Sequence, residues 1–168
     1  DTLNGGGGDD FLHGGAGADT IVGGNGRDTL SYAVSSAGVS IDLRPYDEDA
    51  VALAEGGDAE GDVISEVENL SGSSHDDTLQ GNGGANTLIG GAGVDTLIGG
   101  EGADILVSGD PRSVQGASQN ATSENVDGGL GTDYIVLTAD SRILNNVESK
   151  PDVILQGGDK ADRLLITE

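Results

Sequence analysis

Aspartates recur at nine-residue intervals inside the glycine-rich stretches of this sequence, as in GGAGVDTLIGGEGADIL, where Asp95 and Asp104 occupy equivalent places in two successive segments. Glycine loses more backbone entropy on folding than any other residue, and aspartate favours neither helices nor strands. Two carboxylates about 4 Å apart also repel each other, by roughly 4 kcal/mol at an effective dielectric near 20. Cations are the natural partners of such carboxylates, so we expect a bound cation to complete the fold.

A nine-residue register describes much of the chain, with aspartate in the sixth place and an aliphatic residue in the eighth. Its copies lie at residues 5–31 (three copies), 72–89 (two imperfect copies), 90–107 (two clean copies), and 128–136 and 157–165 (one each). The first residues, Asp1-Thr2-Leu3, match the end of another copy. We therefore expect the chain to be a fragment of a longer protein.

The pattern G-G-x-G-x-D-x-U-x, in which U is aliphatic, resembles the calcium-binding nonapeptide of the RTX (repeats-in-toxin) family of secreted bacterial proteins. A single glycine-rich match is a weak signal, but back-to-back copies at a fixed period are specific. The stretches DTLSYA, GVSIDL and VENLSGS also resemble segments of many bacterial RTX proteins. The resemblance implies an all-β solenoid, a right-handed parallel β-roll or β-helix with strand-containing insertions.

In such a roll the six glycine-rich residues form a turn, the last three form a short strand, and two nonapeptides complete one coil. Equivalent residues eighteen apart then stack, alternately on the two edges of the coil. The expected pairs are Asp1 with Asp19, Asp10 with Asp28, Asp77 with Asp95, and Asn86 with Asp104. Calcium takes six to eight oxygen ligands from carboxylates and backbone carbonyls, and two stacked turns offer both kinds.

The expected ligands of several Ca²⁺ ions are therefore the sixth-place residues Asp1, Asp10, Asp19, Asp28, Asp77, Asn86, Asp95, Asp104, Asp133 and Asp162. The alternative is that these side chains only cap turns, as aspartate does in many loops. That alternative is strongest for the imperfect or isolated copies, which contain Asp77, Asn86, Asp133 and Asp162. Asn86 brings a carbonyl oxygen without a charge, so its edge should bind calcium more weakly.

The aliphatic residues of the eighth place should point inward and form the core. They are Leu3, Leu12, Ile21, Leu30, Leu79, Leu88, Leu97, Leu106, Ile135 and Leu164. One such residue in nine gives little apolar burial to offset the backbone entropy that each nonapeptide loses. Metal binding is therefore expected to be coupled to folding.

Composition restricts the partners of the chain. Its 168 residues hold 30 Asp and Glu against 7 Lys and Arg, a formal net charge of −23, and no cysteine. Such an excess of carboxylates argues against binding to nucleic acid or to an anionic membrane surface. No apolar run is long enough to span a membrane, and without cysteine there is no disulfide or thiolate metal site.

We interpret residues 1–168 as a single RTX roll domain. Its expected parts are a first array (1–31), an insertion (32–71), a second array (72–107), and a loop with degenerate repeats (108–168). Within the insertion, residues 38–43 read as a strand and residues 62–70 as a second apolar-patterned segment that extends the coil. The acidic stretch 47–62 is interpreted as a solvated loop, with an extra cation site as the alternative.

No catalytic constellation is visible, so the chain is not expected to be an enzyme. His13 and His75 lie inside repeats, and His75 replaces the fourth-place glycine of an imperfect copy. A carboxylate that binds calcium is a poor general acid or base. One remote alternative is calcium-triggered self-processing at Asp110-Pro111, because some RTX proteins carry modules that cleave themselves at such a bond.

The resemblance implies a calcium-binding module that folds on binding Ca²⁺ outside the bacterial cell. It would act as the secretion and folding scaffold of a larger protein exported by a type I system, with adjacent domains of that protein as its partners. The alternative is a calcium-dependent adhesion or polysaccharide-binding module whose insertions hold a surface ligand. Exposed aromatic residues would favour that alternative, and the chain has only Phe11, Tyr32, Tyr46 and Tyr134.

Overall fold

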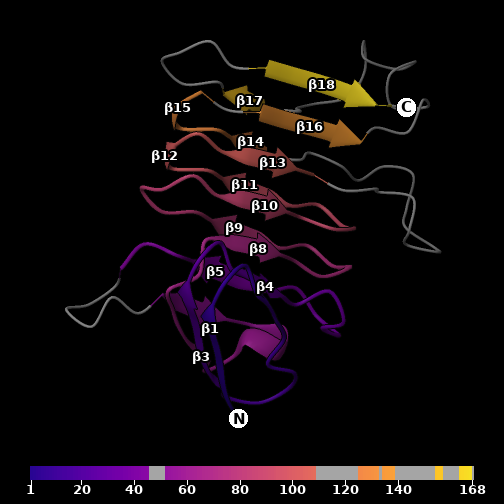
Figure 1. Ribbon diagram of the computed structural model, residues 1–168. Helices are drawn as coiled ribbons and strands as arrows, with labels where there is room; N and C mark the ends of the chain where they lie inside the picture. The colour runs from indigo at the N-terminus through magenta and orange to yellow at the C-terminus, as the bar shows by residue number, and fades with distance from the viewer. Residues whose placement is uncertain (46–51, 109–124, 133, 139–153, 157–162, 168) are drawn as a thin grey trace.

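The computed structural model describes residues 1–45, 52–108, 125–132, 134–138, 154–156 and 163–167. Figure 1 shows these residues as a stack of short strands that rises from β1 at the N-terminal end to β18 at the other. The only helical element in the described part is the 3₁₀ turn η1 (Gly57–Ala59). No helix of the described residues is long and apolar enough to cross a membrane.

The chain alternates between two faces of this stack. In the described residues, one face is a seven-stranded sheet in the order β18 (Arg163–Thr167), β16 (Tyr134–Thr138), β13 (Ile105–Val107), β10 (Thr87–Ile89), β8 (Asn69–Ser71), β4 (Thr29–Ser31), β2 (Phe11–Leu12). The other contains a six-stranded sheet in the order β17 (Ile154–Gln156), β14 (Asn125–Asp127), β11 (Thr96–Ile98), β9 (Thr78–Gln80), β5 (Ser40–Asp42), β6 (Leu53–Glu55). Beside it stands a three-stranded sheet, β1 (Thr2–Gly7), β3 (Thr20–Asn25), β7 (Val63–Ser65), and β12 (Glu101–Gly102) pairs with β15 (Leu130–Gly131) in the glycine-rich turns.

Neighbouring strands are parallel and in the register that the nine-residue period predicts. Leu88 of β10 lies opposite Leu106 of β13, and Leu79 of β9 lies opposite Leu97 of β11. Only β6 runs antiparallel to a neighbour, β5, within the strand pairs of the described residues. The prediction of an all-β roll of stacked parallel strands is confirmed.

The eighth-place residues form the core, as predicted. Buried members are Leu12, Ile21, Leu30, Leu79, Leu88, Leu97, Leu106 and Ile135. Leu3 is partly buried and packs against them, whereas the side chain of Leu164 lies outside the described part. Because successive strand residues point to opposite faces, one inward residue per three-residue strand is all that this geometry allows.

The insertion is built into the stack. Its predicted strand at residues 38–43 is β5, and the segment 62–70 contains two strands, β7 and β8. Strand β8 pairs with β4 on one side and with β10 on the other, so it forms an ordinary rung of the seven-stranded sheet. On the opposite face, Ala52, the residue before β6, forms an antiparallel bridge with Ile64 of β7. One continuous cluster of buried residues therefore runs through both arrays.

This register predicts a sharp contrast between two adjacent residues of β10. Leu88 is fully buried, whereas Ile89 is 38% exposed. Leu88→Ala should lower the free energy of unfolding by about 2–5 kcal/mol, because it leaves a cavity in the core. Ile89→Ala should cost under about 1 kcal/mol. Urea denaturation in saturating calcium measures both, and equal losses would mean that the inward register is wrong.

Candidate metal centre

The sixth-place side chains form hydrogen-bonded ladders along both edges of the roll. In each step, one carboxylate oxygen accepts the backbone N–H of the equivalent residue in the preceding coil. The distances are 2.8 Å from Asp10 N to Asp28 Oδ1, 3.0 Å from Asp77 N to Asp95 Oδ1, and 2.8 Å from Asn86 N to Asp104 Oδ1. The amino group of Asp1 likewise donates to Asp19 Oδ1. The structure thus brings together all four predicted pairs.

The second carboxylate oxygen turns back into the glycine-rich turn of its own repeat. The Oδ2 atoms of Asp10, Asp19 and Asp28 are buried there without a hydrogen-bond partner in the described residues. Leaving a charged oxygen buried and unsatisfied costs several kcal/mol, roughly, unless an opposite charge compensates it. These atoms therefore fit a bound cation.

The first-place glycine makes room for that oxygen. A Cβ on Gly5 would lie 2.7 Å from Asp10 Oδ2, and a Cβ on Gly23 would lie 2.8 Å from Asp28 Oδ2. The same point beside Gly5 is 2.5 Å from the carbonyl oxygen of Gly23 in the next coil. A carboxylate oxygen and a backbone carbonyl oxygen therefore converge on one small space, which a side chain would fill.

This oxygen set suits a hard cation. No group of three or more His, Cys, Asp or Glu side chains that could hold a metal ion occurs among the described residues. Each clean turn instead combines a single carboxylate with backbone carbonyls, which are ligands that calcium accepts and that transition metals disfavour. Whatever ion binds must therefore take most of its ligands from the backbone.

Asp77 and Asn86 differ from Asp10, Asp19 and Asp28, because groups of their own turn also hydrogen-bond to their side chains. Asp77 Oδ2 accepts the backbone N–H of Ser73 at 2.6 Å, and its Oδ1 accepts the Ser73 hydroxyl at 2.9 Å. Asn86 Oδ1 accepts the Asn82 N–H at 2.9 Å, while its Nδ2 donates to the Glu68 carbonyl at 2.7 Å. Both geometries support the alternative that these two side chains cap turns.

Two ladder residues escaped the sequence analysis. Asp62 Oδ1 accepts the Asp19 N–H at 2.8 Å, and its Oδ2 accepts the Tyr32 hydroxyl at 2.6 Å. Glu68 Oε2 accepts the Asp28 N–H at 2.8 Å. The interpretation of residues 47–62 as a solvated loop is wrong at Asp62, which is only 6% exposed. The signal was available, since DVIS at 62–65 and ENLS at 68–71 repeat the form of DTLS at 28–31.

Burial shifts the acid–base behaviour of these groups. It raises the pKa of the Tyr32 hydroxyl well above its usual range, and the hydrogen bond to Asp62 raises it further. Burial also raises the pKa of Asp95 to about 7, against the lowering effect of the hydrogen bond from the Asp77 N–H. The pKa of Asp77 is raised for the same reason, although hydrogen bonds from Val39 and Ser73 oppose the shift.

The two histidine side chains form no hydrogen bond with a ladder side chain in the described residues. His13 is exposed, and its Nδ1 lies 2.9 Å from the Ser31 carbonyl oxygen. His75 is exposed as well. Asp133, Asp162 and Asp110-Pro111 fall outside the described residues, so their predicted roles stay predictions.

Comparison with protein-family models agrees with this geometry. The model of the RTX calcium-binding nonapeptide repeat matches four copies, over residues 1–30 and 71–106. The repeats at residues 1–30 and 71–106 are RTX calcium-binding repeats. Repeats of this family bind several calcium ions, and the family is a structural module and not a catalytic one. No curated protein matches the chain.

The RTX turn predicts that a methyl group is tolerated at one glycine and not at another of the same strand. A Cβ on Gly5 would collide with Asp10 Oδ2 and the Gly23 carbonyl, whereas a Cβ on Gly7 meets nothing within 4 Å. Gly5→Ala should weaken calcium binding at this edge about tenfold or more, which is about 1.4 kcal/mol. Gly7→Ala should bind like the wild type. Competition with a chromophoric chelator measures both affinities, and equal effects would exclude Oδ2 as a ligand.

The raised pKa of Asp95 predicts an unusual pH dependence of the metal-free protein. Because its pKa rises from 3.8 in the unfolded chain to about 7 in the folded one, the folded state holds the proton more tightly. The stability from this group is fully present below the unfolded pKa and is lost as pH rises through about 7. In chelator, the small β signal in far-UV circular dichroism should therefore weaken as pH rises from about 5 to about 8.

Asp95→Asn provides the matched control, because asparagine resembles the protonated acid. In chelator, the variant should show a flatter pH profile and a stronger β signal than the wild type at about pH 8. Saturating calcium should reverse the wild-type trend, because calcium binds the deprotonated form. Identical profiles for the two proteins in chelator would contradict the assignment.

Proposed function

We propose that this chain is a calcium-triggered folding module, which orders on binding Ca²⁺ outside the cell and scaffolds a larger protein exported by a type I system. The observation that carries the proposal is the set of buried Oδ2 atoms of Asp10, Asp19 and Asp28, which have no hydrogen-bond partner among the described residues. Backbone carbonyl oxygens lie beside the Oδ2 atoms of Asp10 and Asp28, a set of negative groups that needs a cation.

Charge makes the metal-free state resist compaction. The chain has a formal net charge of −23, and the ladders place carboxylates directly above one another at both edges. Self-repulsion of this kind destabilises a compact state. Ladder aspartates such as Asp10 and Asp28 therefore hold their coils together only when their charge is compensated, which couples the ordering of these coils to calcium.

The same coupling supports the proposed location. Extracellular calcium modules work with dissociation constants of about 10⁻⁴–10⁻³ M, a range far above the affinities of cytosolic sensors. In a calcium-poor cytosol the repeats that carry such sites stay unfolded, and they order after export. The RTX repeats support this sequence of events, with adjacent domains of the parent protein as the partners that benefit from a folded scaffold.

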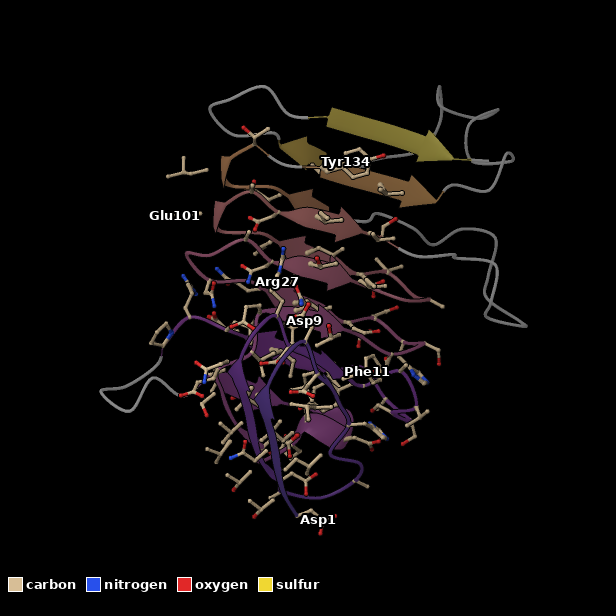
Figure 2. The ribbon with its side chains drawn as sticks, in the orientation of Figure 1. Asp1, Asp9, Phe11, Arg27, Glu101 and Tyr134 are labelled. Atoms are coloured by element: carbon tan, nitrogen blue, oxygen red, sulfur yellow. The ribbon has the colours of Figure 1, made fainter. Side chains whose placement is uncertain are left out.

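The alternative of a polysaccharide-binding module has less support. Tyr32 is fully buried, so it cannot stack on a sugar. Among the described residues the exposed aromatic side chains are Phe11 and Tyr134, which Figure 2 shows well apart along the stack, on β2 and β16. They do not form a common platform.

Far-UV circular dichroism of chelator-treated protein tests the proposal. Adding calcium should convert a mainly disordered spectrum to a β spectrum, and magnesium at the same concentration should not, because it requires stricter octahedral geometry. Asp10→Asn should raise the calcium midpoint about threefold or more, since it removes one ladder charge. Glu101→Gln removes an equal charge from an exposed site and should change it little. A complete β spectrum in chelator would overturn the proposal.

A further inference from the structure

One edge of the roll, here called the first edge, carries Asp28, Glu68 and Asn86. Hydrogen bonds within the chain connect the two repeat arrays at this edge. Glu68 Oε2 accepts the Asp28 N–H at 2.8 Å, and the Glu68 carbonyl accepts Asn86 Nδ2 at 2.7 Å. Only three residues, 66–68, separate β7 from β8, whereas six, 90–95, separate β10 from β11. Arg27 precedes β4, and Ala85 precedes β10, the two strands that pair with β8. The Arg27 guanidinium donates to the Ala85 carbonyl at 3.0 Å. A fixed positive charge thus lies beside the interruption.

The opposite edge, here called the second edge, carries Asp62 and Asp77, and hydrogen bonds within the chain satisfy both carboxylates. Asp62 bonds through one oxygen to the Asp19 N–H and through the other to the Tyr32 hydroxyl. Asp77 Oδ1 accepts the Val39 N–H at 2.8 Å, and its Oδ2 accepts the Ser73 N–H. Both oxygens of both carboxylates therefore have donors from the chain.

These middle positions contrast with the first array. There, the Oδ2 atoms of Asp10, Asp19 and Asp28 have no hydrogen-bond partner in the described residues. The same ladder thus uses two chemistries, one that needs an added cation and one that the chain completes by itself.

Apolar burial is concentrated in the same middle region. Most of the described buried apolar residues lie between Leu30 and Leu88, including Tyr32, Ile41 and Ile64 from the insertion. Each repeat contributes one inward aliphatic residue to the core. The insertion contributes several more buried apolar side chains. Its burial supplies stabilisation that does not depend on metal.

We propose that residues 29–45 and 52–89 form a metal-independent clasp, which stays folded without calcium and divides the calcium sites into two separately filling groups. One group contains the ladder from Asp1 to Asp28, and the other contains Asp95 and Asp104. Asp77 and Asn86 belong to the clasp and bind no calcium. The division into two groups of sites rests on the proposed calcium binding in both repeat arrays. The clasp itself does not rest on calcium binding.

Hydrogen exchange followed by mass spectrometry on the full 168-residue chain tests the clasp. In chelator, amides of β4, β8 and β10 should exchange at least about tenfold more slowly than those of β1, β3, β11 and β13. Calcium should then slow exchange in the two outer regions and change the middle little.

Variants locate the groups responsible. Tyr32→Phe should speed exchange of the middle region in chelator about tenfold, because it leaves Asp62 Oδ2 buried without its donor. Tyr134→Phe, at an exposed tyrosine, should have no such effect. Asn86→Asp sets a carboxylate against the Glu68 carbonyl, so it should also speed exchange of β8 and β10 in chelator, and calcium should restore their protection.

A calcium titration tests the division. Asp10→Asn should shift the midpoint for β1 and β3 and leave that for β11 and β13 within about twofold. Uniformly fast exchange in chelator, followed by one calcium-induced step along the whole chain, would overturn the clasp and leave the proposed calcium-coupled folding intact. Slow exchange of every region in chelator, with no response to calcium, would overturn both. A shift of both midpoints by Asp10→Asn would overturn the division.

Discussion

The roll depends on a carboxylate whose two oxygens do different work. One oxygen of each ladder aspartate accepts a backbone N–H from the preceding coil, which fixes the stacking of the turns. In the first array the other oxygen lies buried over a glycine, with no hydrogen-bond donor among the described residues. Both oxygens are needed. The hydrogen-bonded oxygen fixes how two coils stack, and the buried oxygen carries a charge that a cation compensates.

Glycine and side-chain length follow from this constraint. The first-place glycine has no Cβ because a carboxylate oxygen occupies that space. Aspartate is just long enough to reach the backbone N–H above it while its second oxygen stays within a six-residue turn. Glu68 shows the converse, since its longer side chain makes the same bond from a turn of only three residues, 66–68. Turn length and ladder residue are therefore matched.

Much of the fold could be predicted from the period alone. Copies at a fixed spacing define which residues stack and which leucines point inward, because both follow from local geometry repeated along the chain. The nine-residue spacing alone does not place Asp62 and Glu68, since they meet Asp19 and Asp28 across 43 and 40 residues. Only the likeness of DVIS and ENLS to DTLS could have indicated them. Two bonds of Asp77 and Asn86 were also hidden, because the Val39 N–H and the Glu68 carbonyl belong to the insertion, whose place in the stack the period does not give.

A crystal structure grown with calcium, with anomalous scattering to identify the ions, tests the central claim most directly. We expect ions at about 2.3–2.6 Å from the Oδ2 atoms of Asp10 and Asp28, completed by backbone carbonyls of the stacked turns. Asp77 and Asn86 should keep their chain partners and bind no ion. If the Oδ2 atoms of Asp10 and Asp28 instead accept hydrogen bonds from the chain and the ions lie elsewhere, the proposed division of work between the two carboxylate oxygens is wrong.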